Sequence, residues 1–560
     1  MPPYQLPRPV NKYVLRHSPR RNRVTGTDRE LIGTVFPKMG GKAFLAMAKM
    51  RVIAWNRALR RLEDVQEAQL ARIIASAKDS EFGRRHGFSS IRNYADYRRR
   101  VPVGDYDSFA SDFARIRAGE TNVLTSNRIR YICESAGSSG MGKRKFLPLA
   151  DAQIKLQAGS GVDGVFRYLA AKNDDTFTQG FIVSVLPPAI TRPEGSVEIT
   201  NNPALMARNL PLPSQFVYLP DRDTMEITDI DRKLDVIAEN YLDHDVRTLT
   251  GTTCWFSILF DKLIAAANRR GRNVSTVREL WPNLRFLVGG GVVADPYLPV
   301  LRDRVGREDI DLIDTYNATE GGIFAVTDVT SPDPGLIMIP DRGVFYEFIP
   351  LEEAESDSPT RLALWEVETG RDYVIHMTTV SGLYSYRLGD IVRFSALWPH
   401  RLEYSGRLSG CLSVTQELTT HLEVQRAMQT ASDRVPARMV DYTVASELGV
   451  HGTAKGRYLI FAEFLDGGAP ADQEAFAQAF DEAHQAQNRA YREARDRDTA
   501  LFGPVLISLP PGSVTRFMKE AGLTSLQTKF PRIARDSQRD ILLSYGGAPG
   551  IGGSTDLRPN

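Results

Sequence analysis

The sequence predicts an α/β protein with a large N-terminal domain, built of mixed sheets flanked by helices, and a small mobile α+β C-terminal domain. Two observations lead to this fold class. Strand-like and helix-like segments alternate through the middle of the chain, which is typical of α/β proteins with parallel pairing. After about residue 405 this alternation ends, and 560 residues exceed what one hydrophobic core usually serves.

Helical periodicity dominates the first hundred residues. In QEAQLARIIASAKD, the apolar residues that share one face at the spacing of a packed amphipathic helix are Leu70, Ile73, Ile74 and Ala77. Pro102 ends this region, and an irregular segment leads to a predicted strand at Ile129–Cys133.

The middle of the chain supplies the alternating elements. The segments VRTLTGT and LRFLVGGG predict strands, and Ser257–Ala267 between them predicts a helix. IDLIDTYNATEGG predicts another strand that runs into a loop. Because ligands of parallel sheets bind beyond the carboxyl ends of the strands, we expect a site in the polar and glycine-rich loops there.

The C-terminal segments predict a compact unit with its own core. MVDYTVASE, YLIFAEF and PVLISLP predict strands, and one long helix has an apolar stripe formed by Phe476, Ala479, Phe480 and Ala483. We therefore predict a large domain at 31–400 and a small one at 405–545. Residues 1–30 are predicted to form a flexible basic arm, and 546–560, GGAPGIGGSTDLRPN, a disordered tail that buries little.

Composition argues against several classes of protein. With 25% charged residues and a net charge of +2, the chain lacks the basic excess of a dedicated nucleic-acid binder. The cysteines Cys133, Cys254 and Cys411 are far apart, which disfavours a disulfide framework or a structural zinc site and fits a reducing compartment. No apolar run is long enough to span a bilayer. We expect a cytoplasmic monomer without nucleic-acid or membrane partners.

The amino-terminal segment MPPYQLPRPVNKYVLRHSPRRNRVTG is rich in proline and arginine and lacks the apolar core of a secretion signal. Its charges could contact nucleic acid or acidic lipid. The interpretation that the sequence favours is a disordered or surface-wrapping arm.

A flexible, basic loop follows the predicted strand RIRYICE. It reads SAGSSGMGKRK, so glycines that allow converging backbone N–H groups stand beside Ser138, Ser139 and the cations Lys143, Arg144 and Lys145. A polyphosphate requires such a set of donors and charges. The loop is not a Walker motif, and a plain surface turn explains it equally well.

Two further segments combine groups that a nucleotide needs. In Tyr316-Asn317-Ala318-Thr319-Glu320-Gly321-Gly322, the ring could stack on adenine, Thr319 could bond a phosphate, and Glu320 could bind Mg²⁺. The alternative is a strand end with a solvated glutamate before a glycine turn. In YSYRLGD, the carboxylate of Asp390 could accept both hydroxyls of a ribose, and the alternative is a hairpin turn.

The order of these segments, followed by a Gly-Arg pair, is the succession seen in the adenylate-forming superfamily. Longer stretches resemble the Gretchen Hagen family of auxin-responsive acyl-acid amido synthetases, and of these the sequence looks closer to bacterial relatives. The resemblance runs from roughly Val65 to Ile533. The stretches that carry it include RRHGFSSIRNYADYRRRVPVGDYDSF, GETNVLTSNRIRYICESAGSSG, WPNLRFLVGGG, TYNATEGGIFAV, GLYSYRLGDIVRF, GRLSGCLSVTQELT and LTSLQTKFPRI.

The resemblance implies an enzyme that joins a small carboxylic acid to an amine through an acyl-adenylate, with ATP and Mg²⁺. By the same resemblance, Ser138 and Ser139 would hold phosphates, and Lys529 would contact the oxygens at the reacting centre. Tyr316 would lie near adenine, Thr319 near the α-phosphate, and Glu320 on Mg²⁺, and Asn317 and Ala318 would also bind the nucleotide. Asp390 would take the ribose hydroxyls, and Arg407 would sit at the swivel between the domains.

The acyl pocket is less well defined by the sequence. The resemblance implies that Gly290 and Gly291 let the adenine and acyl groups approach the backbone. The helix after the basic loop, with Val162 and Phe166, could form one wall, and TGTTCWFS, with Thr252 and Trp255, another. Such apolar residues are more often plain core.

Three functions remain open. The favoured one is an ATP-dependent, amide-forming ligase for a small aromatic or hydrophobic acid and an amino-acid-like amine. An acyl-CoA ligase would share the adenylate, and a non-catalytic binding protein would share only the fold. The match to the Gln-x-Lys-x-Pro-Arg element around Lys529 favours the first, and the joint presence of Glu320, Asp390 and Lys529 argues against the third.

Overall fold

The computed structural model describes residues 26–135, 145–209, 217–290, 298–333, 335–412, 414, 417, 419–448, 450, 455–496, 501–521 and 530–545. Its α-helices are α1 (Gly26–Arg60), α2 (Leu62–Ala77), α3 (Glu81–Arg85), α4 (Tyr94–Arg100), α5 (Tyr106–Arg117), α6 (Asp151–Lys172), α7 (Asn202–Asn209), α8 (Arg222–Met225), α9 (Ile230–Tyr241), α10 (Cys254–Arg269), α11 (Leu298–Val305), α12 (His421–Arg434), α13 (Gln473–Gln487), α14 (Arg489–Arg495), α15 (Ser513–Glu520) and α16 (Asp536–Leu543).

The strands are β1 (Ile129–Ser135), β2 (Lys145–Ala150), β3 (Phe181–Val185), β4 (Thr191–Glu194), β5 (Val197–Thr200), β6 (Tyr218–Leu219), β7 (Val246–Gly251), β8 (Phe286–Gly290), β9 (Asp311–Ala318), β10 (Gly322–Thr327), β11 (Leu336–Met338), β12 (Val344–Pro350), β13 (Leu362–Ala363), β14 (Asp372–Thr379), β15 (Tyr386–Leu397), β16 (His400–Arg407), β17 (Met439–Leu448), β18 (Gly456–Phe464) and β19 (Val505–Leu509). Each strand predicted from the sequence is among them.

One long sheet runs through the large part of the molecule, in the order β13-β12-β14-β15-β16-β11-β10-β9-β8-β7-β3-β6. From β6 to β9 the strands are parallel, and from β9 to β13 they are antiparallel. A second sheet has the order β2-β1-β5-β4. The prediction of an α/β fold with mixed sheets is therefore confirmed.

The helices that follow the parallel strands form because their apolar residues recur at helical spacing. On α9, Leu234, Ile237, Ala238 and Tyr241 are buried, and Asp229 caps the first turn by accepting from the N–H of Arg232 at 3.1 Å. These residues share a hydrophobic cluster with α10, β3 and β7. The predicted helix at 257–267 is the middle of α10.

Helix α2 has the buried face that the sequence predicts. A buried glutamine on the same helix, Gln66, donates to the carbonyls of Pro340 and Val344 and accepts from the N–H of Tyr346, which joins α2 to β12. Helix α1 begins at Gly26, so residues 26–30 of the predicted flexible arm belong to a helix. The rest of that arm and the predicted tail at 546–560 lie outside the described residues.

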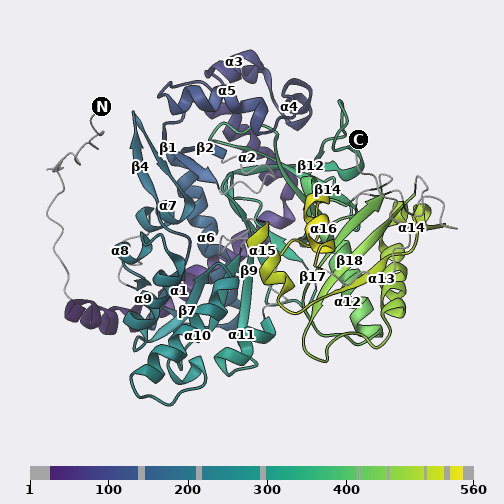
Figure 1. The fold of residues 1–560 in the computed structure, drawn as a ribbon. Coiled ribbons are helices and arrows are strands. Elements are labelled where there is room, and N and C mark those ends of the chain that lie inside the picture. The colour runs from purple at the N-terminus through teal and green to yellow at the C-terminus, as the bar shows by residue number, and fades with distance from the viewer. Residues whose placement is uncertain are drawn as a thin grey trace, which may run out of the picture.

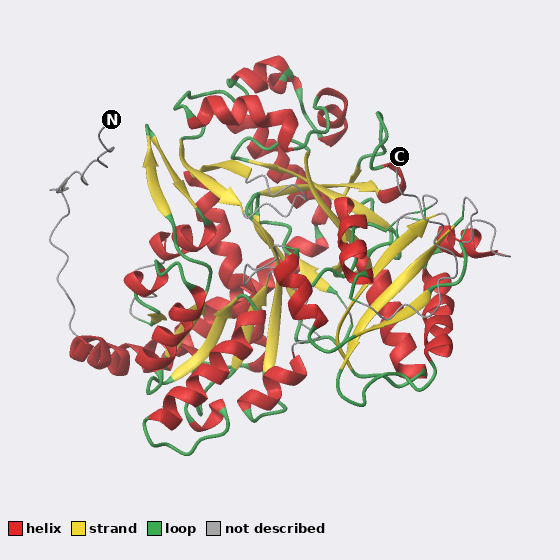
Figure 2. Cartoon of the chain, viewed as in Figure 1, coloured by secondary structure: helices red, strands yellow, loops and turns green. Residues whose placement is uncertain are grey.

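The C-terminal strands form a separate sheet, in the order β17-β18-β19. Helices α12 and α13 cover it, and Phe476, Ala479 and Phe480 lie in its own hydrophobic cluster. Figures 1 and 2 show this unit, green to yellow in Figure 1, on one side of the large sheet. The domain bounds 31–400 and 405–545 and the mobility of the small domain remain predictions.

No helix within the described residues has both the length and the apolar character needed to cross a bilayer.

Candidate active site

Glu320 occupies the turn between β9 and β10. The N–H of Gly321 donates to the carbonyl of Ala318, and Gly322 has a φ of 89°, which side chains larger than hydrogen rarely allow. The turn points inward, so Glu320 is only 5% exposed. The alternative of a solvated glutamate is therefore wrong, because neighbouring elements cover a turn that would be a surface feature in an isolated hairpin.

Helices α6 and α7 hold this turn in place. The side-chain amide of Gln157 donates to the carbonyl of Thr319 at 3.3 Å, and Oγ of Ser160 accepts from the N–H of Ile323 at 3.2 Å. Nδ2 of Asn202 donates to Oγ1 of Thr319 at 3.4 Å. Sequence reasoning missed Ser160 and Asn202, because a single Ser or Asn in a helix has no local pattern that marks it.

Asp390 lies within β15, where the pairing with β14 shifts its register between Val374 and His376. Gly389 has a φ of 86° at this irregularity, which turns the next side chain inward. Asp390 is 4% exposed. The hairpin-turn alternative is wrong, because the strand continues to Leu397.

Tyr316 and Arg407 contact the carboxylate of Asp390 from both sides. The hydroxyl of Tyr316 donates to Oδ2 at 2.9 Å, and Nε of Arg407 lies 2.9 Å from Oδ1. Arg407 is on β16, directly opposite Asp390 in the ladder. The ring of Tyr316 is buried and meets Phe324 edge-on, with the centroids 5.4 Å apart. The structure thus brings together three of the residues that the sequence predicts for a nucleotide site.

Burial dominates the electrostatics of the two carboxylates. It raises the pKa of Glu320, an effect that the charges of Lys145 and Arg407 oppose. Burial likewise raises the pKa of Asp390, and Arg407 and the Tyr316 hydroxyl oppose it. The negative charge of Asp390 also raises the pKa of Glu320, and buried acids with shifted pKa values are a frequent feature of functional sites.

Lys145 is the last cation of the basic loop and the first residue of β2. Its ammonium lies 3.5 Å from the hydroxyl of Tyr386 and 5.8 Å from the ring centroids of Tyr106 and Tyr386. Lys145 therefore places a positive charge next to the candidate site. Ser138 and Ser139, with Lys143 and Arg144, lie outside the described residues, as do Gly291 and Lys529.

The end of β8 lies against β9 with little spare room. A Cβ added at Gly290 would lie 2.5 Å from Oγ1 of Thr315 and 2.8 Å from Nδ2 of Asn317. Asn317 is exposed, and Ala318 and Thr319 are half-buried. The close approach of these side-chain atoms of β9 is a physical reason for a glycine at position 290.

The side chains predicted to line an acyl pocket lie in different surroundings. Trp255 belongs to the hydrophobic cluster of α9 and α10, and the N–H of Thr252 donates to the carbonyl of Val185. Phe166 meets Phe44 of α1 edge-on at 5.2 Å, and Val162 is 41% exposed. Their role as an acyl wall remains a prediction, as do the roles of the other predicted site residues.

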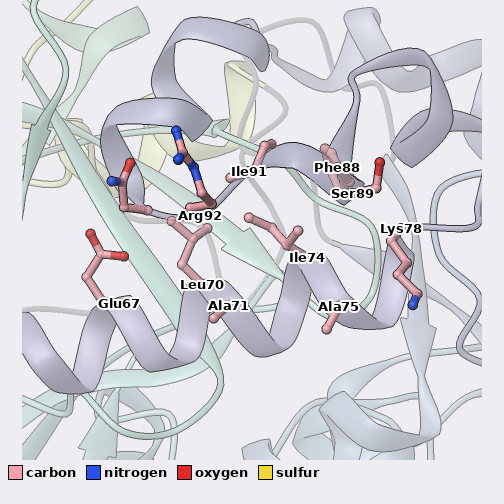
Figure 3. A pocket seen from close by; sticks show the side chains of 11 residues that line it. Glu67, Leu70, Ala71, Ile74, Ala75, Lys78, Phe88, Ser89, Ile91 and Arg92 are labelled. Carbon is pink, nitrogen blue, oxygen red and sulfur yellow. The ribbon is translucent and has the colours of Figure 1, made fainter.

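A pocket of 190 Å³ opens elsewhere, between α2 and the segment from Phe88 to Asn93. Figure 3 shows Leu70, Ile74 and Ile91 around it, with the charged side chains of Glu67, Lys78 and Arg92 nearby. None of its lining residues is a predicted site residue.

The described residues contain no group of three or more His, Cys, Asp or Glu side chains that could hold a metal ion. Mg²⁺ does not need such a group, because it usually takes one or two carboxylates together with phosphate oxygens and water. The buried carboxylate of Glu320, with no ion-pair partner among the described residues, fits that requirement.

Comparisons with known proteins agree with the predicted resemblance. Models of the GH3 family N-terminal, central and C-terminal domains match residues 54–188, 337–407 and 422–538. Indole-3-acetic acid-amido synthetase GH3.8 of Oryza sativa subsp. indica is 24% identical over 548 residues, which are 84% of this chain and 88% of the relative.

Two solved structures show the same fold. One is AtGH3.15 acyl acid amido synthetase in complex with 2,4-DB, with a TM-score of 0.69, 17% identity and coverage of 90% of this chain and 96% of that one. The other is 2-hydroxyisobutyryl-CoA ligase in the postadenylation state, with a TM-score of 0.52, 12% identity and coverage of 95% and 96%. The fold is thus common to an amido synthetase and a CoA ligase.

Proposed function

Because the chain belongs to the GH3 family, we propose that it is an ATP-dependent acyl-acid amido synthetase. It activates a small carboxylic acid as an acyl-adenylate, releases pyrophosphate, and transfers the acyl group to an amine, which is an amino acid. The acid is aromatic or hydrophobic. Relatives named as indole-3-acetic acid-amido synthetases support this choice of substrates.

The observation that carries the proposal is the cluster of the buried side chains of Tyr316, Asp390 and Glu320 with the half-buried Arg407. Three separate parts of the chain, the β9–β10 segment, β15 and β16, supply it. A nucleotide offers matching groups, since a carboxylate can accept two ribose hydroxyls and a guanidinium can pair with phosphate. In this proposal Asp390 takes the ribose, and Thr319 and Lys145 contact phosphate oxygens.

The first half-reaction needs no protein nucleophile, because the substrate carboxylate attacks the α-phosphorus and the bond to pyrophosphate breaks. Negative charge then accumulates on phosphate oxygens. Lys145 and the donors of the turn at Thr319 stabilise that charge in a site from which neighbouring elements exclude water. Gln157, Ser160 and Asn202 act through this turn by fixing its position.

Mg²⁺, when bound, would neutralise charge on the phosphates, and Glu320 would hold it. Burial already raises the pKa of Glu320, so the carboxylate gains more from a cation there than it would in water.

In the second half-reaction the amine nitrogen attacks the acyl carbon and AMP leaves. We assign Lys529, which is outside the described residues, to the oxygens at the reacting centre. Movement of the C-terminal domain about the swivel near Arg407 would bring it there.

The test has two stages. Exchange of labelled pyrophosphate into ATP, dependent on added carboxylic acid, should reveal the adenylate, and its absence with every acid would refute an adenylating enzyme. Mass spectrometry after addition of amino acids or coenzyme A then separates amide from thioester. A thioester without amide would overturn the synthetase assignment and establish a CoA ligase. Lys529→Ala should lower the rate of adenylation about 10²-fold or more.

A further inference from the structure

Positive charge is concentrated at the beginning of the chain. Residues 1–61 contain 14 lysines and arginines but only two acidic residues, Asp28 and Glu30, which gives a net charge of +12. The whole chain has a net charge of only +2, so residues 62–560 have a net charge of −10. From Leu31 to Arg60 there is no acidic residue, and this stretch lies within α1.

The part of α1 that faces away from the protein combines these charges with large apolar side chains. Met47, Met50 and Ile53 are 44%, 64% and 60% exposed, and their spacing of three residues places them on one side of the helix. The outward face of α1 consists of exposed residues Lys42, Ala43, Ala46, Met47, Lys49, Met50, Ile53, Ala54, Arg57 and Arg60. Soluble proteins rarely group exposed large apolar residues in this way.

The opposite side of α1 packs against α6, which fixes the helix in place. Leu45, Trp55 and Leu59 are buried in a cluster with residues of α6. Arg51 donates to both oxygens of the fully buried Asp163 on α6 and to Asp341. The outward face is therefore presented by an anchored helix. Figure 1 shows the start of α1, in purple, extending beyond the rest of the fold.

We propose that the outward face of α1 is a docking surface for an anionic lipid bilayer. The cations would contact lipid phosphates, and Met47, Met50 and Ile53 would enter the interface between head groups and acyl chains. Nucleic acid would satisfy the cations but would leave these three apolar side chains in water. This inference is independent of the reaction proposed above, and it revises the expectation that the protein has no membrane partner.

The experiment is sedimentation of the full-length protein with vesicles. We expect the protein to sediment with vesicles of phosphatidylcholine and phosphatidylserine, to remain in solution with phosphatidylcholine alone, and to dissociate as salt is raised. The variant M47S/M50S/I53S should bind the anionic vesicles at least ~10-fold more weakly. The variant K42E/R57E/R60E should bind roughly 100-fold more weakly, since each cation near the surface contributes about five-fold.

The matched control is V440S/L448S/L465S, which removes three exposed apolar side chains from the C-terminal sheet and its border. It should bind vesicles like the wild type, and all variants should keep the wild-type melting temperature. Failure to sediment with anionic vesicles would overturn the proposal. An equal loss of vesicle binding in the control variant would also overturn it, as would binding to RNA that is stronger than binding to vesicles. A dimer seen by light scattering, abolished in M47S/M50S/I53S and formed without vesicle binding, would overturn it as well.

Discussion

The hydroxyl of Tyr316 lies 2.9 Å from Oδ2 of Asp390, although the two residues are 74 positions apart in the chain. Tyr316 is on β9 and Asp390 on β15, and three strands separate these two strands in the sheet. Arg407 approaches the other carboxylate oxygen at 2.9 Å. The orientation of Asp390 is therefore set before any nucleotide binds.

Tyr316→Phe tests this orientation. The ring and its packing on Phe324 remain, and only the donor to Asp390 is lost. Hydrogen bonds to charged groups contribute about 1.5–3 kcal/mol, so we expect the KM for ATP to rise about 10-fold or more. Pyrophosphate exchange measured over a range of ATP concentrations gives this value.

The control for that variant is Tyr346→Phe. Tyr346 is also a buried tyrosine, and its hydroxyl donates to the carbonyl of Ile339 away from Asp390. The variant Tyr346→Phe should be less stable than the wild type but should have the same KM for ATP. Equal KM values for Tyr316→Phe and the wild type would remove Asp390 from the nucleotide site.

Glu320→Gln should separate stability from activity. Burial raises the pKa of Glu320, so the folded protein binds this proton more tightly than the unfolded chain does. The carboxyl therefore reduces the free energy of unfolding as pH rises through that raised pKa. The neutral amide removes this cost, so the melting temperature at neutral pH should rise while adenylation falls at least ~100-fold.

The pH dependence of the wild type follows from the same shift. Activity should fall on acidification at a pH above the range in which an ordinary glutamate titrates, because protonated Glu320 no longer holds a cation. Two results would contradict the assigned environment of this carboxyl. One is a lower melting temperature for Glu320→Gln, and the other is a wild-type activity that falls on acidification only in the pH range in which an ordinary glutamate titrates.

Gly290→Ala should impair the site by steric overlap. Its Cβ would lie 2.5 Å from Oγ1 of Thr315 and 2.8 Å from Nδ2 of Asn317, so β8 or the Asn317 side chain must move. We expect adenylation to fall about 10-fold or more, since small displacements of positioning groups are costly in catalysis. The measurement is acid-dependent pyrophosphate exchange.

Gly161→Ala is the matched control for that change. Gly161 lies within α6, and a Cβ there would have no atom within 4 Å. The substitution should leave adenylation unchanged and stabilise the helix by about 1 kcal/mol. If Gly290→Ala were as active as Gly161→Ala, the tight approach of β8 to β9 would have no role in the reaction.

Arg393→Met should weaken the contact between the large sheet and the C-terminal unit. Arg393 of β15 pairs with Asp372 and lies 3.2 Å from Glu423 of α12, and all three side chains are buried or nearly so. Removing one member of a buried ionic group typically costs about 3–5 kcal/mol. The melting temperature should fall accordingly.

Arg426→Met provides the comparison, because Arg426 of α12 pairs with Glu403 at the same boundary but is 41% exposed. Its loss should cost about 1 kcal/mol or less. Similar melting temperatures for the two variants would show that the buried group does not hold the units together.

Local pattern was enough to predict several elements of the fold. The stripe on α2 and the apolar runs of β7, β8 and β17–β19 lie where the sequence places them, because helical and strand periodicities are set by neighbouring residues. The bend at Gly389 and the inward turn at Glu320 could not be predicted in this way. Gly-Asp and Glu-Gly pairs are ordinary in exposed turns, and only the packing of distant elements buries them.

Several helices and strands, the family and the order of the motifs could be predicted from the amino-acid sequence, because the patterns that carry them lie within short segments. The folded structure was needed to show that Tyr316, Asp390 and Arg407 meet, that Glu320 is enclosed, and that Arg393 joins the C-terminal unit. These contacts depend on strand order and register across the sheet. Strand order and register result from the packing of the whole chain, which no short segment specifies.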